Sequence, residues 1–385
     1  MWMKSCECFP RLTIMELRFF LAKAVLFLYL LFAVLAFYYG SLIFRVGAVA
    51  VGLLLIPLLY ESSSRNGLLL VVMGMLVIAF SLPSLIWSEG KSFFLVITLF
   101  SNLAVAWAVF RLDVARYFFD WFFFFFLLLT AFLVFFGGYG PDEFNSFLSG
   151  YSRNSYSALL IAAACGYMVS CCWQGRKLSI LVMLAFFLVH FPLYGRSGIA
   201  VSGLLFFAAL FSRLSLLRVR YVALVVALVL VVIIPFLGEL SGFIGQGLDR
   251  TNFARGFESV RGKMLEDYIG SMNVVSLFFG YNFSELEAIK IYGDGNPHNA
   301  YIRLHGYLGV FFAVFVLFWL ASSIFLLVDR LYLMFFVSVL VFVRAFFDII
   351  YLFNLFDFFF FPCTFYLFYR GFFVRRICFY RLKAY

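Results

Sequence analysis

The segment from residue 296 to residue 309 holds side chains that could transfer a proton. It contains His298 and His305, two of the three histidines in the 385-residue chain. Imidazole is the side chain whose ordinary pKa lets it gain or lose a proton near neutral pH. The preceding Asn296-Pro297 is typical of a helix start, with Asn as the N-cap and Pro in the first helical position. We therefore predict that His298 lies in the first turn of a helix, where the helix dipole keeps the ring neutral and able to accept a proton.

Two other interpretations of these histidines remain open. On one helix, His298, Ile302 and His305 would share a face at spacings of i, i+4 and i+7. A histidine at a water interface can serve packing alone, without chemistry. A metal ion shared by both rings is less favoured, because seven helical residues rise by about 10.5 Å, which is too far for joint ligation without distortion.

A basic side chain in a tight turn is the second candidate. Arg196 lies in Gly195-Arg196-Ser197-Gly198, whose small residues leave the guanidinium accessible. Such a group suits bidentate contact with phosphate oxygens. The alternative is a turn whose arginine only extends to the membrane surface.

Polar side chains inside apolar stretches form a third group. Arg344 and Asp348 stand at i and i+4, and we expect a structural ion pair, with a role in a substrate path as the second interpretation. His190, in Leu-Val-His-Phe-Pro, is expected to be a packing residue.

The elements that must position these side chains are membrane helices. The chain is 65% hydrophobic and 12% charged, whereas soluble domains carry about 25% charged residues. Its 58 phenylalanines are too many for one globular core and indicate lipid-facing and interhelical surfaces. We predict an all-α polytopic integral membrane protein, with residues 1–385 as a single membrane domain. The net charge of +10 fits membrane topology and anionic headgroups better than nucleic acid.

About twelve apolar runs are long enough to be membrane spans. They lie near 17–39, 41–60, 68–87, 92–110, 117–137, 155–172, 178–194, 197–212, 219–237, 302–327, 331–350 and 354–369. No cleavable signal peptide is evident, because the first run is long enough to remain as a span. The distribution of Lys and Arg predicts that both termini are cytoplasmic. The segment 238–301 is then a large outer loop, and the amphipathic spacing of Val260, Met264 and Tyr268 predicts a helix within it.

Several basic residues fall on the predicted outer side, where Lys and Arg are usually rare. They are Arg153, Arg196, Arg250, Arg255, Arg261, Lys263, Lys290 and Arg303. For Arg250, Arg255, Lys263 and Lys290 we favour pairing with the acidic residues of the same loop. Arg153 and Arg196 have few acidic neighbours in sequence, so anion binding is the stronger interpretation there.

Motifs for nucleotide, redox or metal chemistry are absent from the sequence. It has no Walker A motif, no Rossmann glycine pattern and no HExxH. Cys6-x-Cys8 lacks a second half, and we expect the seven cysteines to be reduced thiols. We therefore expect no cofactor and no metal.

Together these motifs resemble the bacterial O-antigen polymerase and O-antigen ligase superfamily. Its His-Asn motif, followed after about nine residues by Gly-x-x-Gly, is similar to His298-Asn299 and Gly309, with Phe312 in place of the last glycine. Its Arg-Ser/Gly turn between central spans is similar to the turn at Arg196. Segments 259–264 and 277–282 resemble an Arg-containing helix and a Gly-x-Gly turn that here lacks its second glycine. Segment 149–154 resembles the Gly-and-Asn start of a middle span.

The resemblance implies a GT-C-like glycosyltransferase that acts on undecaprenyl-diphosphate-linked sugars at the periplasmic face of the bacterial inner membrane. His298 would be the base, and Arg196 and Arg261 would hold the diphosphate and stabilise its developing charge. Such a reaction needs no metal ion, and a single displacement would invert the anomeric centre. The remaining candidates, for substrate binding, are Arg153, Asn154, Asn299, Tyr301, Arg303 and His305.

Within this resemblance we expect a polymerase, which uses lipid-linked oligosaccharide as both donor and acceptor. The close alternative is the ligase, which transfers the glycan to lipid A-core. A lipid-linked oligosaccharide flippase or other transporter is a third interpretation. It would place charges along a path through the bilayer, whereas most of the non-structural charge here collects on the predicted outer side, which favours an enzyme. The partners implied are the lipid bilayer, a chain-length regulator and a flippase, and no nucleic acid.

Overall fold

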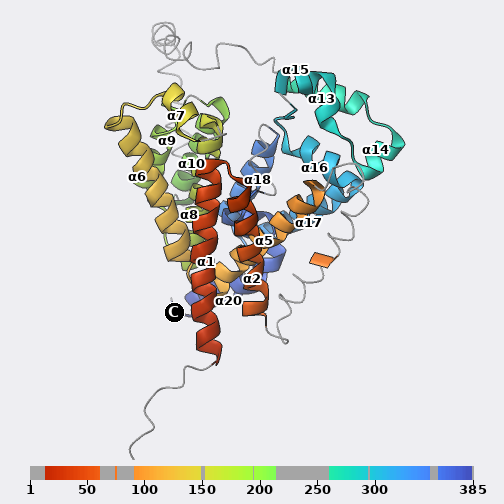
Figure 1. Cartoon of the computed structure of the whole chain (residues 1–385). Coiled ribbons are helices and arrows are strands. Elements are labelled where there is room, and N and C mark those ends of the chain that lie inside the picture. The colour runs from red at the N-terminus through yellow and green to blue at the C-terminus, as the bar shows by residue number, and fades with distance from the viewer. Residues whose placement is uncertain are drawn as a thin grey trace, which may run out of the picture.

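The computed structural model describes residues 14–60, 74–75, 91–148, 152–193, 195–213, 260–293, 295–346 and 354–383. This part of the chain is helical and contains no strand (Figure 1). Six of its helical stretches are long and apolar enough to cross a membrane, and two shorter apolar helices accompany them. In this part of the chain, the prediction of an all-α fold with several candidate membrane spans is therefore confirmed. The spans expected near 68–87 and 219–237 lie outside the described residues, apart from the short piece 74–75.

The longer helices of the bundle, apart from α20, follow the apolar runs of the sequence. They are α1 (Ile14–Tyr39), α2 (Leu42–Leu59), α5 (Lys91–Arg111), η1 (Arg116–Asp120) with α6 (Trp121–Phe135), α8 (Arg153–Gln174), α9 (Ile180–Leu188), α10 (Arg196–Arg213), α17 (Phe312–Val328), α18 (Tyr332–Ala345) and α20 (Tyr366–Lys383). α8 is the central helix, and almost all of its residues are buried inside the protein. Its small residues allow this, since a Cβ at Gly166 would overlap the ring of Phe359.

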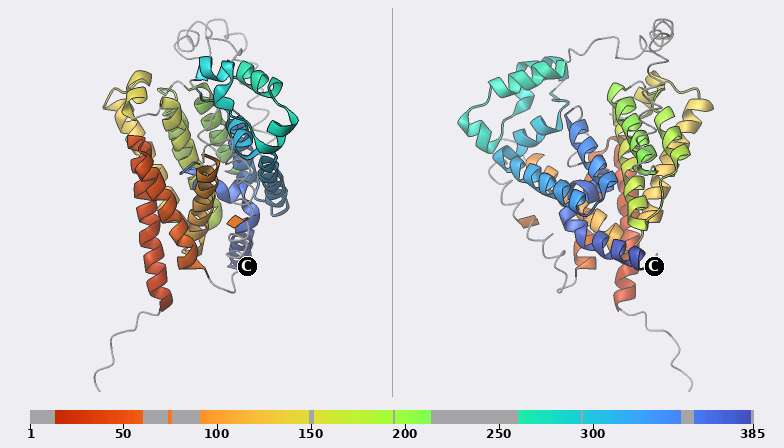
Figure 2. Two further views of the ribbon diagram at one scale, coloured as in Figure 1. Left: turned by 45° about the vertical axis from the view of Figure 1, so that its right-hand side comes forward. Right: turned by 180° about the vertical axis from the view of Figure 1, so that it is seen from behind.

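Five of the short helices lie at one end of the bundle, which we call the loop end. There lie α7 (Pro141–Phe147), α13 (Val260–Gly270), α14 (Val274–Phe279), η4 (Phe283–Glu285) and α15 (Glu287–Gly293). The start of α1 and the end of α20 lie at the opposite end (Figures 1 and 2). We call residues 260–293 and 295–299 the capping lobe. Its small core contains Met264, Tyr268 and Ile289, so the helix predicted from the spacing of Met264 and Tyr268 is confirmed.

The expected span at 302–327 is interrupted near its beginning. The stretch Ala300–Val328 is one candidate span by length and composition, but α16 (Ala300–Leu308) ends at Gly309, and η5 (Gly309–Phe311) separates it from α17. Gly309 has a φ of +57°, a conformation that glycine adopts without strain. A Cβ at this position would overlap the carbonyl of Phe278. The interruption therefore lets α14 pack against the corner between α16 and α17.

The expected span at 354–369 is wrong. Residues 354–365 form only η6 (Asp357–Phe359) and the single turn α19 (Phe361–Thr364), and the long helix α20 begins at Tyr366. This segment is almost wholly buried in protein. Irregular backbone within a membrane is tolerated only where it is buried in protein or lines a water-filled cavity. Hydropathy alone predicts a span here because a buried aromatic turn is as apolar as a lipid-facing helix.

The side chain of Asn102 satisfies part of this irregular backbone. Its Nδ2 donates to the carbonyl of Asn354 at 2.8 Å, and its Oδ1 accepts from the amide of Phe358 at 3.1 Å. Tyr29 of α1 donates its hydroxyl to the carbonyl of Leu355. Helices α1 and α5 thus anchor the broken segment in the middle of the bundle.

Candidate functional site

His298 does not lie in the first turn of a helix, and this prediction is corrected. The N-cap of α16 is Asn299, whose Oδ1 accepts from the amides of Tyr301 at 2.8 Å and Ile302 at 3.3 Å. Asn296 instead accepts from the amide of His298 at 2.9 Å, which is the geometry of an Asx turn. Both asparagines are good N-caps, and the one nearer the apolar run starts the helix.

The backbone of His298 is strained. Its φ is +47°, in the left-handed region that few non-glycine residues occupy. The turn at Asn296 and the cap at Asn299 hold the residue on both sides. Such strain persists only where the surrounding structure fixes it, and it is often found at functional sites.

The ring of His298 lies against α13 and α15 of the capping lobe. A Cβ at Gly293 would lie 3.8 Å from His298 Cδ2 and 3.0 Å from Met264 Cε, so all three residues meet at one point. His298 is half-buried there. The ring therefore sits at the junction between the lobe and the start of α16.

His305 has both ring nitrogens engaged by protein. Nδ1 lies 2.7 Å from the hydroxyl of Tyr268, and Nε2 lies 3.0 Å from the carbonyl of Leu277. In a neutral ring Nε2 must then carry the proton, and Nδ1 accepts from the tyrosine. His305 thus ties α13 and α14 to α16 and is positioned as a support for the lobe. Within the described part of the chain, no group of three or more metal-ligating side chains is present.

Two further predicted substrate-binding residues also serve as supports. Tyr301 donates its hydroxyl to the carbonyl of Phe342 at 2.6 Å, and its ring packs on Phe346 at 4.2 Å between centroids. Asn299 is buried and uses its side-chain oxygen as the helix cap. Arg303 is half-buried on α16, close enough to Tyr307 to interact with it electrostatically.

The second group of predicted residues gathers where α8 and α10 begin. Arg153 is the first residue of α8, and its amide donates to Asn145 Oδ1 at 3.1 Å. Arg196 is the first residue of α10. Asn154 Oδ1 lies 3.1 Å from the point that a Cβ of Gly195 would occupy. The structure thus brings the starts of α8 and α10 side by side, while the side chains of Arg196 and Arg261 lie outside its described part.

Three polar residues that the sequence did not connect adjoin this group. A Cβ at Gly198 would overlap Ser157 Oγ and lie 3.5 Å from His190 Cδ2. Both residues are buried, and His190 Nδ1 lies 2.8 Å from the carbonyl of Phe186. Arg344, buried near the end of α18, is close enough to interact electrostatically with His190. Burial of His190 agrees with its predicted packing role, while Asp348, the expected partner of Arg344, lies outside the described residues.

α18 lies between the two groups. It packs on α8 and α10. Its Phe342, and Phe346 directly after its end, contact Tyr301, which lies three residues after His298. The connection passes through contacts between residues far apart in sequence, and no sequence spacing indicates it. Both groups therefore belong to the same end of the bundle.

The expected ion pairs of two loop lysines are not found. Lys263 and Lys290 are exposed, and within the described residues neither has an acidic partner within 4 Å. Asp267 instead accepts from the amide of Ala288 at 3.1 Å and so joins α13 to α15. An exposed ion pair contributes little to stability in water, whereas the Asp267 carboxylate links two helices of the lobe. Arg250 and Arg255 lie outside the described residues.

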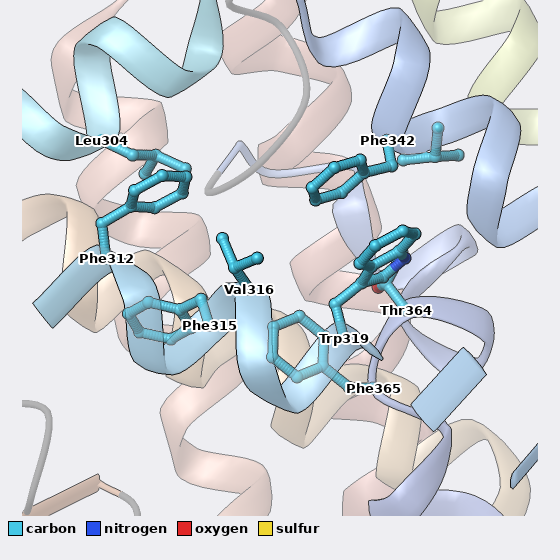
Figure 3. A pocket seen from close by; sticks show the side chains of 9 residues that line it. Leu304, Phe312, Phe315, Val316, Trp319, Phe342, Thr364 and Phe365 are labelled. Atoms are coloured by element: carbon cyan, nitrogen blue, oxygen red, sulfur yellow. The ribbon is translucent and has the colours of Figure 1, made fainter. Parts of the chain in front are cut away.

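An apolar cavity lies beside α16, between α17, α18 and α19 (Figure 3). The cavity is small, with a volume of about 30 Å³, and its walls are mainly aromatic. Trp319 stacks on Phe342 at 3.7 Å between centroids and donates Nε1 to Ser338 Oγ at 2.7 Å. Leu304, one turn after Tyr301, lines the cavity. A cavity of this size is a gap in the packing of α16 to α19 and has no room for a substrate group.

Comparison with protein-family models, curated proteins and solved structures finds no match to this chain. The proposed function therefore rests on the sequence motifs and on the geometry of the loop end.

Proposed function

We propose that the chain is an O-antigen polymerase, a glycosyltransferase that joins undecaprenyl-diphosphate-linked repeat units without a metal ion and with inversion. The observation that carries the proposal is His298, held in a strained backbone conformation at the junction of the capping lobe and a membrane bundle. A half-buried imidazole fixed in this way is suited to proton transfer with a substrate at the membrane surface.

In the proposed reaction, a hydroxyl of the acceptor sugar attacks the anomeric carbon of the donor. The new glycosidic C–O bond forms as the bond between that carbon and the diphosphate oxygen breaks. His298 takes the hydroxyl proton, and the undecaprenyl diphosphate leaves with the bonding electron pair. Arg196 and Arg261 neutralise the charge that develops on the diphosphate.

The residues around His298 then have supporting roles. Asn296 and Asn299 hold its backbone, while His305 and Tyr268 fix the lobe on α16. Arg153 and Asn154, at the start of α8, would contact the substrate beside the turn of Arg196.

The proposed location is the bacterial inner membrane, with both termini cytoplasmic and the loop end periplasmic. The distribution of Lys and Arg supports this orientation. The start of α1 and the end of α20 at the end opposite the capping lobe also agree with it.

Deletion of the gene, followed by gel analysis of lipopolysaccharide, tests the proposal. Loss of a polymerase leaves the core with one repeat unit. Loss of a ligase, the alternative function, leaves no repeat on the core and leaves polymer on the lipid carrier. Loss of a flippase leaves no repeat on the core and no polymer on the lipid carrier, because repeat units never reach the periplasmic face. Only the first pattern, restored by the wild-type gene but not by a His298→Ala gene expressed at equal level, agrees with the proposal.

A further inference from the structure

Helix α14 exposes an unusual number of apolar side chains for a segment outside the membrane spans. The exposed fractions are 73% for Val274, 54% for Val275, 45% for Leu277, 49% for Phe278 and 42% for Phe279. The segment 273–282 contains no charged residue. A continuous exposed apolar surface of this kind marks a contact with a membrane or another protein.

The exposure of α14 results from how tightly its backbone is held. Asn273 and Ser276 form a capping box, with hydrogen bonds of 2.7 Å and 2.9 Å. His305 Nε2 lies 3.0 Å from the carbonyl of Leu277. The inward side of the helix is thus occupied by backbone and by the small Ser276, and the large apolar side chains must point outward.

Glycines bring this helix into close contact with the corner of α16. Gly280 has a φ of +88°, and a Cβ there would overlap the carbonyl of Gly306. A Cβ at Gly309 would overlap the carbonyl of Phe278. α14 is therefore fixed directly beside the start of α17.

The position next to α17 identifies the partner. α17 belongs to a candidate membrane span, and its Val314, Leu317 and Ile324 are exposed, as expected for side chains that face lipid. α14 packs on η5, which immediately precedes α17. In Figure 1 it lies at the edge of the capping lobe farthest from α6 and α7. The apolar surface of α14 is thus continuous with the lipid-facing surface of a span, at the level where that span leaves the membrane.

We infer that α14 is a membrane-surface anchor, with Val274, Val275 and Phe278 inserted among lipid headgroups and the first acyl carbons. Short apolar helices that lie in the interface bind mainly through buried apolar area. Since the segment carries no charge, the anchor recognises the bilayer surface rather than an anionic headgroup. The anchor keeps the capping lobe at a fixed height above the membrane. This inference does not depend on which activity the loop end has.

Nitroxide accessibility in lipid nanodiscs tests the anchor. The background variant has its native cysteines replaced, of which Cys165, Cys171 and Cys363 are buried. Spin labels are then placed singly at Val274→Cys and Phe278→Cys. Leu317→Cys on α17 is the lipid-facing control, and Glu285→Cys, exposed on the polar side of the lobe, is the water-facing control.

Labels at 274 and 278 are expected to collide more with oxygen than with a water-soluble nickel chelate, as at 317, whereas the label at 285 shows the reverse. A water-like ratio at 274 and 278 would overturn the inference. Shielding from both reagents would also overturn it, because another protein or a second copy would then cover α14. If the background variant does not fold, Phe278→Trp and Glu285→Trp in the natural chain serve instead. Brominated lipids should then quench the added fluorescence only at 278.

Discussion

His298 is the residue on which the proposed reaction depends most directly. We expect His298→Ala to lower the rate of glycan elongation by about 10²–10⁴-fold, the usual contribution of a positioned general base. Binding of the lipid-linked substrate should be retained. An elongation assay and a substrate-binding assay on the same purified sample check the loss of rate and the retention of binding. His298 must be neutral to accept a proton, so elongation should also decline on acidification.

His305→Ala is the matched control for that experiment. Its ring holds the lobe through Tyr268 and Leu277, so its loss should lower stability by about 1–2 kcal/mol and activity much less than His298→Ala. If His298→Ala kept a near wild-type rate, another residue would have to be the base. Asp142 or Glu143 would be next, although Glu143 already accepts from the amide of Gly140 at 2.8 Å as a helix cap.

The arginines at the starts of α10 and α13 should be needed for activity but not for folding. We expect Arg196→Ala and Arg261→Ala each to abolish elongation almost completely at an unchanged protein level. Arg→Lys should restore only part of it, because an ammonium group cannot form two parallel hydrogen bonds with a phosphate. Lys290→Ala, at an exposed position of the same lobe, is the control and should keep full activity. Full activity of both arginine variants would exclude their role with the diphosphate.

At the scale of elements, Asn102 should be needed to hold the broken segment 354–365. Asn102→Ala removes the partner of the buried amide of Phe358. It also removes one of two donors to the carbonyl of Asn354, which still accepts from the amide of Asp357. A buried amide costs about 1–3 kcal/mol when left without a partner. We therefore expect a loss of about 1–3 kcal/mol of stability in denaturant titrations in detergent micelles. Thr98→Val is the control, since the Thr98 hydroxyl bonds only to its own helix, at Phe94. Equal losses for the two variants would contradict this role of Asn102.

The contact between the end of α17 and α20 should depend on pH. Asp329 accepts from Arg370 Nε at 2.8 Å and Nη2 at 3.0 Å, and also from the hydroxyl of Tyr366. The hydrogen bonds from Arg370 lower the pKa of the Asp329 carboxyl. A depressed carboxyl pKa stabilises the fold fully above the unfolded value of about 3.9 and loses this effect as the pH falls through the folded value. Asp329→Asn should thus lower the thermal midpoint at neutral pH, and this difference from wild type should shrink below about pH 4.

Exposed Asp142 provides the comparison for that titration. Asp142→Asn should change the thermal midpoint little at either pH. A difference between wild type and Asp329→Asn that stayed constant down to acidic pH would show that the carboxyl does not act through its charge.

Sequence pattern was sufficient for some elements and failed for others for a physical reason. The amphipathic spacing of Met264 and Tyr268 correctly predicted α13, because one face of that helix packs on a core. Hydropathy could not distinguish the buried turns at 357–364 from a span, since both exclude water. Nor could it choose between Asn296 and Asn299 as the cap of α16, or foresee that Tyr301 and Phe342 would bring α16 to α18. The resemblance supplied the expected site residues, and the supporting roles of Asn299, Tyr301 and His305 required the fold.

At the scale of the whole molecule, the loop end should be accessible only from the periplasm. We predict that Ser271→Cys, between α13 and α14, is labelled by a membrane-impermeant maleimide in intact spheroplasts of a strain that lacks other reactive cysteines in this chain. Cysteines introduced at the termini should be labelled only after the inner membrane is permeabilised. Labelling of Ser271→Cys only after permeabilisation would reverse the proposed orientation.

The central position of α8 has a consequence for how substitutions will be tolerated along the chain. Within its most apolar window 94% of residues are buried in protein, against 28% for α1. In a saturation library selected for function, most positions of α1 should accept any apolar residue, because lipid adapts to their shape. Positions of α8 should accept few, since each side chain there meets neighbours that cannot move. The number of residue types accepted at each position should therefore be low along α8, which carries Arg153 and Asn154, and high along helices that face the bilayer. This difference can be measured before any activity is assigned to a single residue.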